Sequence, residues 1–215
     1  NNQLRSLNFN DFQGLESLLR LSLDHNALVI LPSMLLNNLT RLSFLNLNSN
    51  HLEILNSSVF QGMKMLSEIY LSENKLATLP AGLFTDLVEL VTMYLDSNLL
   101  TSLDLSLNSN SVSNSENSAF HGLTNVQLLN LTANHLQSLT ANIFKGLFNL
   151  QYLFMSKNRL SFLAFDIFGD TVNMKFIDLS HNKLTICPNI THLVLQFLNL
   201  QGNLLTKINK DSFST

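Results

Sequence analysis

The chain has 215 residues, of which 46% are hydrophobic and 13% charged, and 12 Lys and Arg against 15 Asp and Glu give a net charge of −3. This balance gives no electrostatic reason to expect binding to nucleic acid or to an anionic membrane. No apolar run reaches the roughly 18 residues of a membrane-spanning helix, and the opening residues NNQL lack the pattern of a signal peptide.

An asparagine recurs along the chain within the pattern LxxLxLxxNxLxxL, as in LLRLSLDHNALVIL at 18–31 and LSEIYLSENKLATL at 66–79. The asparagines are Asn2, Asn26, Asn50, Asn74, Asn98, Asn134, Asn158, Asn182 and Asn203. Their spacing is 24 residues, apart from one interval of 36 and a last interval of 21. Such a repeat predicts a solenoid in which each coil buries its apolar face against its neighbours.

Each repeat predicts a short strand with inward leucines, and together the strands predict a parallel sheet on the concave side of a curved horseshoe. A row of phenylalanines is expected near the convex side, which should be mostly irregular with short helices. The row consists of Phe12, Phe60, Phe84, Phe120, Phe144, Phe168 and Phe213. The asparagine amides should be buried and satisfy backbone groups where each coil turns. Residues 1–215 are therefore predicted to form a single α/β-type leucine-rich repeat solenoid of about nine repeats.

The repeat that contains Asn98 carries twelve extra residues, which fall in the stretch 104–119 between Leu103 and Phe120. Most of this stretch belongs to the serine- and asparagine-rich run SLNSNSVSNSENSAF at 106–120. This composition buries too little apolar surface to fold alone, so a mobile loop is expected. The loop is either a tolerated insertion or a binding or processing segment, and it marks a break with about half the repeats on each side. Neither end carries a cysteine-rich cap, so we expect an interior piece of a longer ectodomain or one whose caps were removed.

Strand alternation predicts which side chains face solvent on the concave side. Two clusters emerge. Tyr70 and Tyr94 lie on adjacent strands, near Glu68, Glu73 and Asp96. The second cluster consists of Tyr152, Phe154, Phe176 and Phe197 on the last three strands. Exposed aromatic patches indicate a binding interface, whereas the general preference of aromatic residues for strands is the plainer explanation.

Four N-x-S/T triplets predict N-glycosylation and an extracellular location: Asn38, Asn56, Asn130 and Asn189. Asn130 stands between Leu129 and Leu131, so its side chain should point outward from a concave strand. A glycan there would obstruct the middle of the sheet. Asn130 is therefore either unmodified or avoided by partners.

No enzymatic function, catalytic residue, metal or cofactor is expected. Asp178, Ser180 and His181 are close in sequence, but outward side chains on one strand do not form a nucleophile–base–orienter arrangement. The histidines that flank repeat asparagines, His25, His51, His135 and His181, occur singly and without partners at zinc spacing. Cys187 stands where most repeats place leucine, which predicts a buried structural thiol.

The 24-residue repeat with its F-x-x-L turn resembles the typical extracellular class of leucine-rich repeat, and it is most similar to Toll-like receptor ectodomains. Repeat ectodomains of seven-helix hormone receptors and Slit-type guidance proteins are similar too, and LATLPAGLF at 76–84 resembles the lamprey-type variable receptors.

The resemblance implies a receptor ectodomain at the cell surface or in the endosomal lumen. Such an ectodomain binds a protein or microbial ligand and signals through a homo- or heterodimer. Membrane attachment would come only through absent parts of the parent chain, and nucleic acid is not expected as a ligand. The alternatives are a secreted or surface adhesion, guidance or matrix protein and a hormone-receptor ectodomain.

Overall fold

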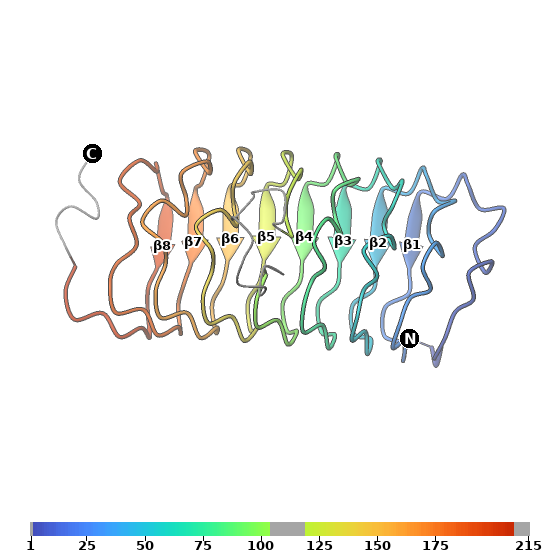
Figure 1. Ribbon diagram of the computed structural model, residues 1–215, viewed down its shortest axis with the longest axis horizontal. Helices are drawn as coiled ribbons and strands as arrows, with labels where there is room; N and C mark the ends of the chain where they lie inside the picture. Colours follow the sequence, from blue (N-terminus) through green and yellow to red (C-terminus); the bar gives the residue numbers. More distant parts are fainter. Residues whose placement is uncertain (1, 104–118, 209–215) are drawn as a thin grey trace, which may run out of the picture.

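The computed structural model describes residues 2–103 and 119–208 and shows coils stacked side by side along one long axis (Figure 1). Eight three-residue strands form one parallel sheet in chain order. They are β1 (Arg20–Ser22), β2 (Phe44–Asn46), β3 (Glu68–Tyr70), β4 (Thr92–Tyr94), β5 (Leu128–Asn130), β6 (Tyr152–Phe154), β7 (Phe176–Asp178) and β8 (Phe197–Asn199). The predicted solenoid with its parallel sheet is confirmed.

Strands pair at equivalent positions of the repeat, and this register continues past the insertion. Leu45 pairs with Ile69, and Met93 of β4 pairs with Leu129 of β5 although 36 residues separate them. The predicted break is therefore wrong for the sheet, because β4 and β5 pair directly across this point of the chain. Most of the predicted loop, residues 104–118, lies outside the described residues. Ala119, which we placed in that loop, is 1% exposed and belongs to the core.

The core is continuous from coil to coil, and five phenylalanines of the predicted row are fully buried in it: Phe60, Phe84, Phe120, Phe144 and Phe168. The ring of Phe84 stacks between those of Phe60 and Phe120, with centroid distances of 5.9 and 6.5 Å. Phe12 is partly buried, and Phe213 lies outside the described residues. Turns make up the convex side, and the short helices expected there are absent from the residues that the structure describes.

The repeat asparagines close the turn of each coil, as predicted. The amide nitrogen of Asn74 donates to the carbonyl oxygens of Leu47 and Leu71, at 3.0 and 3.1 Å. Its amide oxygen accepts the backbone N–H of Leu52 at 3.0 Å. The residue before each asparagine from Asn26 to Asn182, such as Glu73, has a left-handed backbone with φ of 52 to 56°. The side chain thus joins two neighbouring coils and satisfies buried backbone groups.

A second asparagine ladder, which the sequence analysis missed, joins the last coils. It consists of Asn125, Asn149 and Asn173, whose amide nitrogens donate to Val88, Thr124 and Phe148 carbonyl oxygens at 2.8 to 2.9 Å. In the first coils the equivalent positions hold Arg41, Met65 and Glu89. The two halves of the solenoid are therefore held together differently on this side.

Candidate functional site

The outward side chains of the strands form the face on which we expected a ligand, called the sheet face below. In β3, Glu68 and Tyr70 are partly exposed while Ile69 between them is fully buried, in agreement with the predicted alternation. The aromatic residues of this face form two groups. They are separated by β5, whose outward residues are Leu128 and Asn130.

The C-terminal aromatic cluster consists of Tyr152, Phe154, Phe176 and Phe197 on β6 to β8. Phe176 is its centre, with ring centroids 6.4 Å from Tyr152, 4.9 Å from Phe154 and 4.3 Å from Phe197. The Phe176 and Phe197 rings are stacked, with 6° between their planes. Tyr152 is 39% exposed and Phe197 is 45% exposed. The structure thus brings all four predicted residues into contact and leaves two of their rings open to solvent.

Uncharged amides border this cluster, in the column directly before the strands. Gln127 and Gln196 are exposed, and Gln151 is partly exposed. Lys175, in the same column, donates from its ammonium nitrogen to the Gln151 amide oxygen at 2.8 Å. An apolar centre with a polar rim is the usual composition of a protein-binding surface.

The N-terminal aromatic ladder runs over β1 to β4, and its side chains contact one another along its whole length. The guanidinium carbon of Arg20 lies 3.8 Å from the Phe44 ring centroid. The Tyr70 ring centroid lies 5.3 Å from that of Phe44 and 5.0 Å from that of Tyr94. The Tyr70 hydroxyl donates to Glu68 at 2.8 Å. Burial, reinforced by this carboxylate, raises the pKa of Tyr70 to about 12.

A chain of polar contacts runs beside this ladder from β2 to β5. The backbone N–H of Ser72 donates to Asn48 at 2.7 Å, and its hydroxyl donates to Asp96 at 2.6 Å. The same Asp96 oxygen accepts the Asn130 amide nitrogen at 3.0 Å, while the Asn130 oxygen accepts the backbone N–H of Thr132 at 3.0 Å. Asp96 and Asn130, both named as site residues from the sequence, are therefore bonded to each other.

The four predicted glycosylation triplets differ in local geometry. The hydroxyl and backbone N–H of Ser58 both donate to the Asn56 amide oxygen, at 2.8 and 3.0 Å. Thr191 contacts Asn189 in the same way, at 3.0 and 3.3 Å. Asn38 and Asn56 are exposed, and Asn189 is partly exposed. The partly exposed Asn130 differs, because its amide nitrogen already donates within the sheet face.

The Asp178–Ser180–His181 segment has the local structure of a turn. The Asp178 carboxylate accepts the backbone N–H of Ser180 at 2.9 Å, and Ser180 is 4% exposed. His181 packs over Gly202, where an added Cβ would lie 2.7 Å from its Nδ1. In the part of the chain that the structure describes, no group of three or more His, Cys, Asp or Glu could hold a metal. Cys187 is 6% exposed, which confirms the predicted buried thiol.

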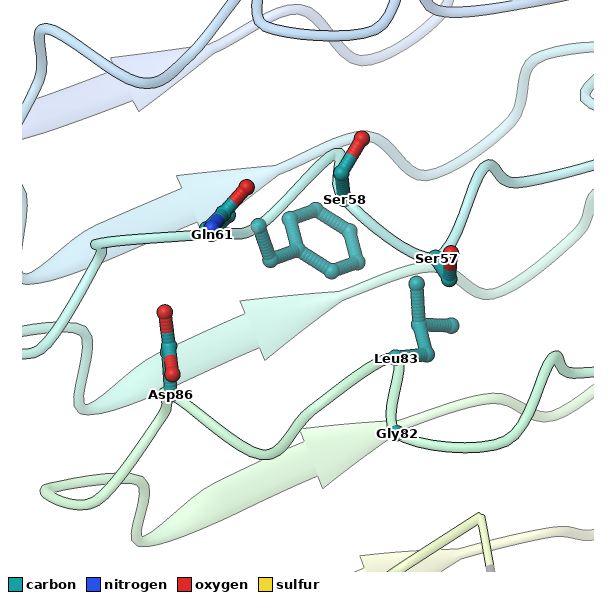
Figure 2. Close-up of a pocket in the computed structure, with 7 residues that line it drawn as sticks. Ser57, Ser58, Gln61, Gly82, Leu83 and Asp86 are labelled. Atoms are coloured by element: carbon teal, nitrogen blue, oxygen red, sulfur yellow. The ribbon is translucent and has the colours of Figure 1, made fainter.

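Two small cavities lie between neighbouring coils on the side opposite the strands. One, of about 300 Å³, is lined by Ser57, Ser58, Phe60, Gln61, Gly82, Leu83 and Asp86. Figure 2 shows Ser58 and Gln61 of one coil across from Gly82 and Asp86 of the next. A second, of about 170 Å³, has equivalent residues from later coils, including Asp170 in the place of Asp86. Their recurrence at one position of the repeat makes them spaces between coils, with no feature of a dedicated site.

The fold of this chain is similar to two solved receptor complexes. Over 98% of the chain it matches a chain in the Toll–Spatzle complex of Drosophila, with a TM-score of 0.77 and 22% identity. Over 96% it matches a chain in the complex of TLR13 with the RNA ssRNA13, with a TM-score of 0.80 and 25% identity. It spans 27% and 34% of those chains, about a third or less.

Among curated protein sequences, none matches this chain. In residues 2–103 and 119–208, no helix has the length and apolar character needed to span a bilayer. The family model for the leucine-rich repeat matches residues 40–100, 103–160 and 124–184, which together make up more than half of the chain. The chain therefore belongs to the leucine-rich repeat family.

Proposed function

We propose that this chain is the ligand-binding part of a Toll-like receptor ectodomain and that its ligand is a protein. The observation that carries the proposal is the C-terminal aromatic cluster, with Tyr152 and Phe197 open to solvent on the sheet face. The Toll–Spatzle and TLR13–ssRNA13 complexes support a ligand-binding solenoid of this shape. Innate-immune recognition with signalling through a homo- or heterodimer is the corresponding role. A secreted adhesion, guidance or matrix protein is the second candidate.

The C-terminal cluster fits a protein ligand better than the N-terminal ladder does. In the ladder, the Arg20 guanidinium packs over the Phe44 ring, and the Tyr70 hydroxyl donates to Glu68. These groups already contact each other and are therefore less available to a ligand. In the cluster, the rings of Tyr152 and Phe197 are exposed, and glutamine side chains border them on the side directly before the strands. Aromatic side chains of this kind supply most of the binding energy where interfaces have been scanned. We therefore assign Tyr152, Phe154, Phe176 and Phe197 to the ligand contact and Tyr70, Tyr94, Glu68 and Asp96 to its border.

The double variant Tyr152→Ala/Phe197→Ala should bind its protein ligand at least about thirtyfold more weakly, because one interface anchor contributes about 2 kcal/mol or more. A library of secreted proteins displayed on cells supplies the ligand, selected with the wild-type chain and titrated with each variant. Phe165→Ala is the matched control, since Phe165 is 78% exposed and lies outside the sheet face. Equal binding by the double variant would refute the assigned contact. A 13-nucleotide single-stranded RNA, tested in parallel, should bind the wild type and the double variant equally, because it does not use the aromatic cluster.

Asn38, Asn56 and Asn189 are proposed to carry N-glycans in the extracellular space or the endosomal lumen, and Asn130 is proposed to stay unmodified. In Asn56 and Asn189 the hydroxyl two residues later contacts the amide oxygen, whereas the glycan attaches to the nitrogen. A glycan on Asn130 would stand in the middle of the sheet face, where its nitrogen contacts Asp96. We further propose that residues 1–215 form one solenoid of about nine repeats.

Chain secreted from mammalian cells should show high glycan occupancy at Asn56 and Asn189 and little at Asn130. Enzymatic deglycosylation in ¹⁸O-labelled water marks each formerly modified asparagine, and peptide mass spectrometry then reports the occupancy of each triplet. High occupancy at Asn130 in folded, secreted chain would contradict the proposal, because the sheet face would then be covered at its centre.

A further inference from the structure

The charges of this chain are unevenly divided between the two halves of the solenoid. Residues 2–103 hold nine carboxylates and five Lys or Arg, whereas residues 119–208 hold three carboxylates and six Lys or Arg. The net charge of −3, which argued against anionic partners, therefore averages over two halves of opposite sign. A local surface of the C-terminal half can attract anions although the whole chain does not.

The positive charges of the C-terminal half concentrate beside the repeat asparagines. We call this surface the basic edge: it consists of His135, Lys157, Arg159, His181 and Lys183, at positions directly before or after Asn134, Asn158 and Asn182. The equivalent positions of the first four complete coils hold His25, Ala27, Ser49, His51, Glu73, Lys75, Ser97 and Leu99. Of these, Lys75 alone is a Lys or Arg, and Glu73 stands on the other side of the same asparagine, Asn74. The concentration of charge is thus specific to the last coils.

Backbone hydrogen bonds place the residues of the basic edge side by side. The N–H of Lys157 donates to the Ser180 carbonyl at 2.9 Å, which sets Lys157 next to His181. The N–H of Arg159 donates to Leu136, and that of Lys183 to Leu160, both at 2.8 Å, so His135, Arg159 and Lys183 follow one another. Neighbouring coils of a sheet are about 4.8 Å apart. The edge therefore holds Lys157, Arg159 and Lys183, with the two histidines beside them, at regular spacing on a fixed backbone.

These cations are exposed and are not neutralised by described neighbours. Lys157, Arg159, His181 and Lys183 are exposed, and His135 is partly exposed. Within the described ranges, the one ion pair joins His25 to Asp24, in the opposite half. The carboxylate nearest in sequence, Asp178, uses an oxygen to accept the Ser180 backbone N–H. An anion at this edge would thus meet cations that have no competing partner among those residues.

We propose that the basic edge binds a linear sulfated polysaccharide. Sulfate esters repeated along a flexible polymer match a row of fixed cations, and arginine and lysine both bind such oxyanions. The positions beyond the edge hold Gln137, Ser161 and Thr185, all exposed and uncharged, which can donate to or accept from sugar hydroxyls. A column of charged side chains thus lies beside a column of neutral polar ones, as sulfate groups lie beside hydroxyl groups in such a polymer.

Single-stranded nucleic acid fits this edge less well, because its binding depends on aromatic side chains that stack on the bases. The basic edge contains no Phe, Tyr or Trp. Beyond it the exposed Phe162 stands alone, because the equivalent positions of the neighbouring coils hold Ser138 and Ile186, so a strand of bases would find no continuous stacking surface. Phe154, three residues before Lys157, leans on Phe176 at 4.9 Å and so toward the start of the neighbouring strand. The aromatic cluster and the basic edge therefore consist of different residues. A negative result for one of the two proposals does not contradict the other.

The test compares two triple variants of the full chain that lose the same charge. K157Q/R159Q/K183Q removes the fixed cations of the edge, while R41Q/K64Q/K145Q removes three exposed cations elsewhere. Binding to heparin is measured by calorimetry between 50 and 300 mM NaCl, with circular dichroism to confirm folding. Wild type and the R41Q/K64Q/K145Q variant should bind. In the edge variant, the slope of log affinity against log salt should fall by about two, since each lost contact contributes roughly 0.7.

Two further ligands show whether the edge requires sulfate groups and whether it prefers a polysaccharide to a nucleic acid. Desulfated heparin should bind at least about tenfold more weakly than heparin, and a 13-nucleotide single-stranded RNA should bind more weakly than heparin at equal salt. Equal effects of the two triple variants would overturn the proposal, because they would show a response to net charge alone. Tighter binding of the RNA than of heparin would also overturn it and would assign the edge to nucleic acid.

Discussion

Phe84→Ala is expected to lower the free energy of unfolding by about 3 to 5 kcal/mol, the range observed for buried phenylalanines. The Phe84 side chain is fully buried, and its ring stacks on both Phe60 and Phe120. Its truncation removes contacts in three coils at once and leaves a cavity that stacked neighbours cannot collapse to fill. Urea unfolding followed by circular dichroism measures the change. Because coils of a solenoid can unfold separately, hydrogen exchange should place the loss at these coils.

Phe165→Ala is the matched control for this experiment, since the same atoms are removed from a side chain that is 78% exposed. Its effect should stay within about 0.5 kcal/mol. A loss at Phe84 no larger than that at Phe165 would show that the phenylalanine row adds little to the stacking of the coils.

Asn74→Ala is expected to cost about 3 kcal/mol or more, even though it removes only a small polar side chain. The substitution leaves the buried Leu52 N–H without its acceptor and takes the donor from the Leu47 and Leu71 carbonyl oxygens. Each buried backbone group that loses its partner costs about 1 to 3 kcal/mol. The same unfolding experiment measures the loss.

Asn173→Ala serves as the control for the asparagine ladder. Asn173 donates one hydrogen bond to Phe148 at an exposed position, where water can replace it. Its loss should therefore cost about 1 kcal/mol or less. Similar costs for the two substitutions would mean that the buried amide of Asn74 is not needed to close the coil.

The strand positions, the buried asparagines and the stacked phenylalanines could all be predicted, because each is fixed by spacing that recurs in most repeats. Asn125, Asn149 and Asn173 were missed because three occurrences in one half do not stand out as a repeat in an asparagine-rich chain. The short convex helices were expected, but the residues after each phenylalanine show no helical periodicity of their own, and turns form there.

For the candidate site, sequence spacing predicted which strand positions face outward but not how the rings would lie. Tyr70 and Tyr94 were correctly placed on adjacent strands, yet only the structure shows Arg20 and Phe44 extending their ladder. The tilt of each side chain determines which rings touch, since Tyr70 contacts Phe44, which is not the residue directly opposite it but the one diagonally across the sheet. The distribution of charge was hidden for a different reason. Net charge sums over all residues, while a partner meets only those at one edge.

The unbroken register between β4 and β5 limits how proteins of this design can change length during evolution. An insertion or deletion of a few residues within a strand would shift the inward leucines of that coil to the outer face and break its pairing with both neighbours. Two kinds of change avoid this: the gain or loss of whole coils, and growth at a point where the chain can leave the coil and return. The 36-residue interval between Asn98 and Asn134 marks a position where new sequence can accumulate without a change of register between the neighbouring strands.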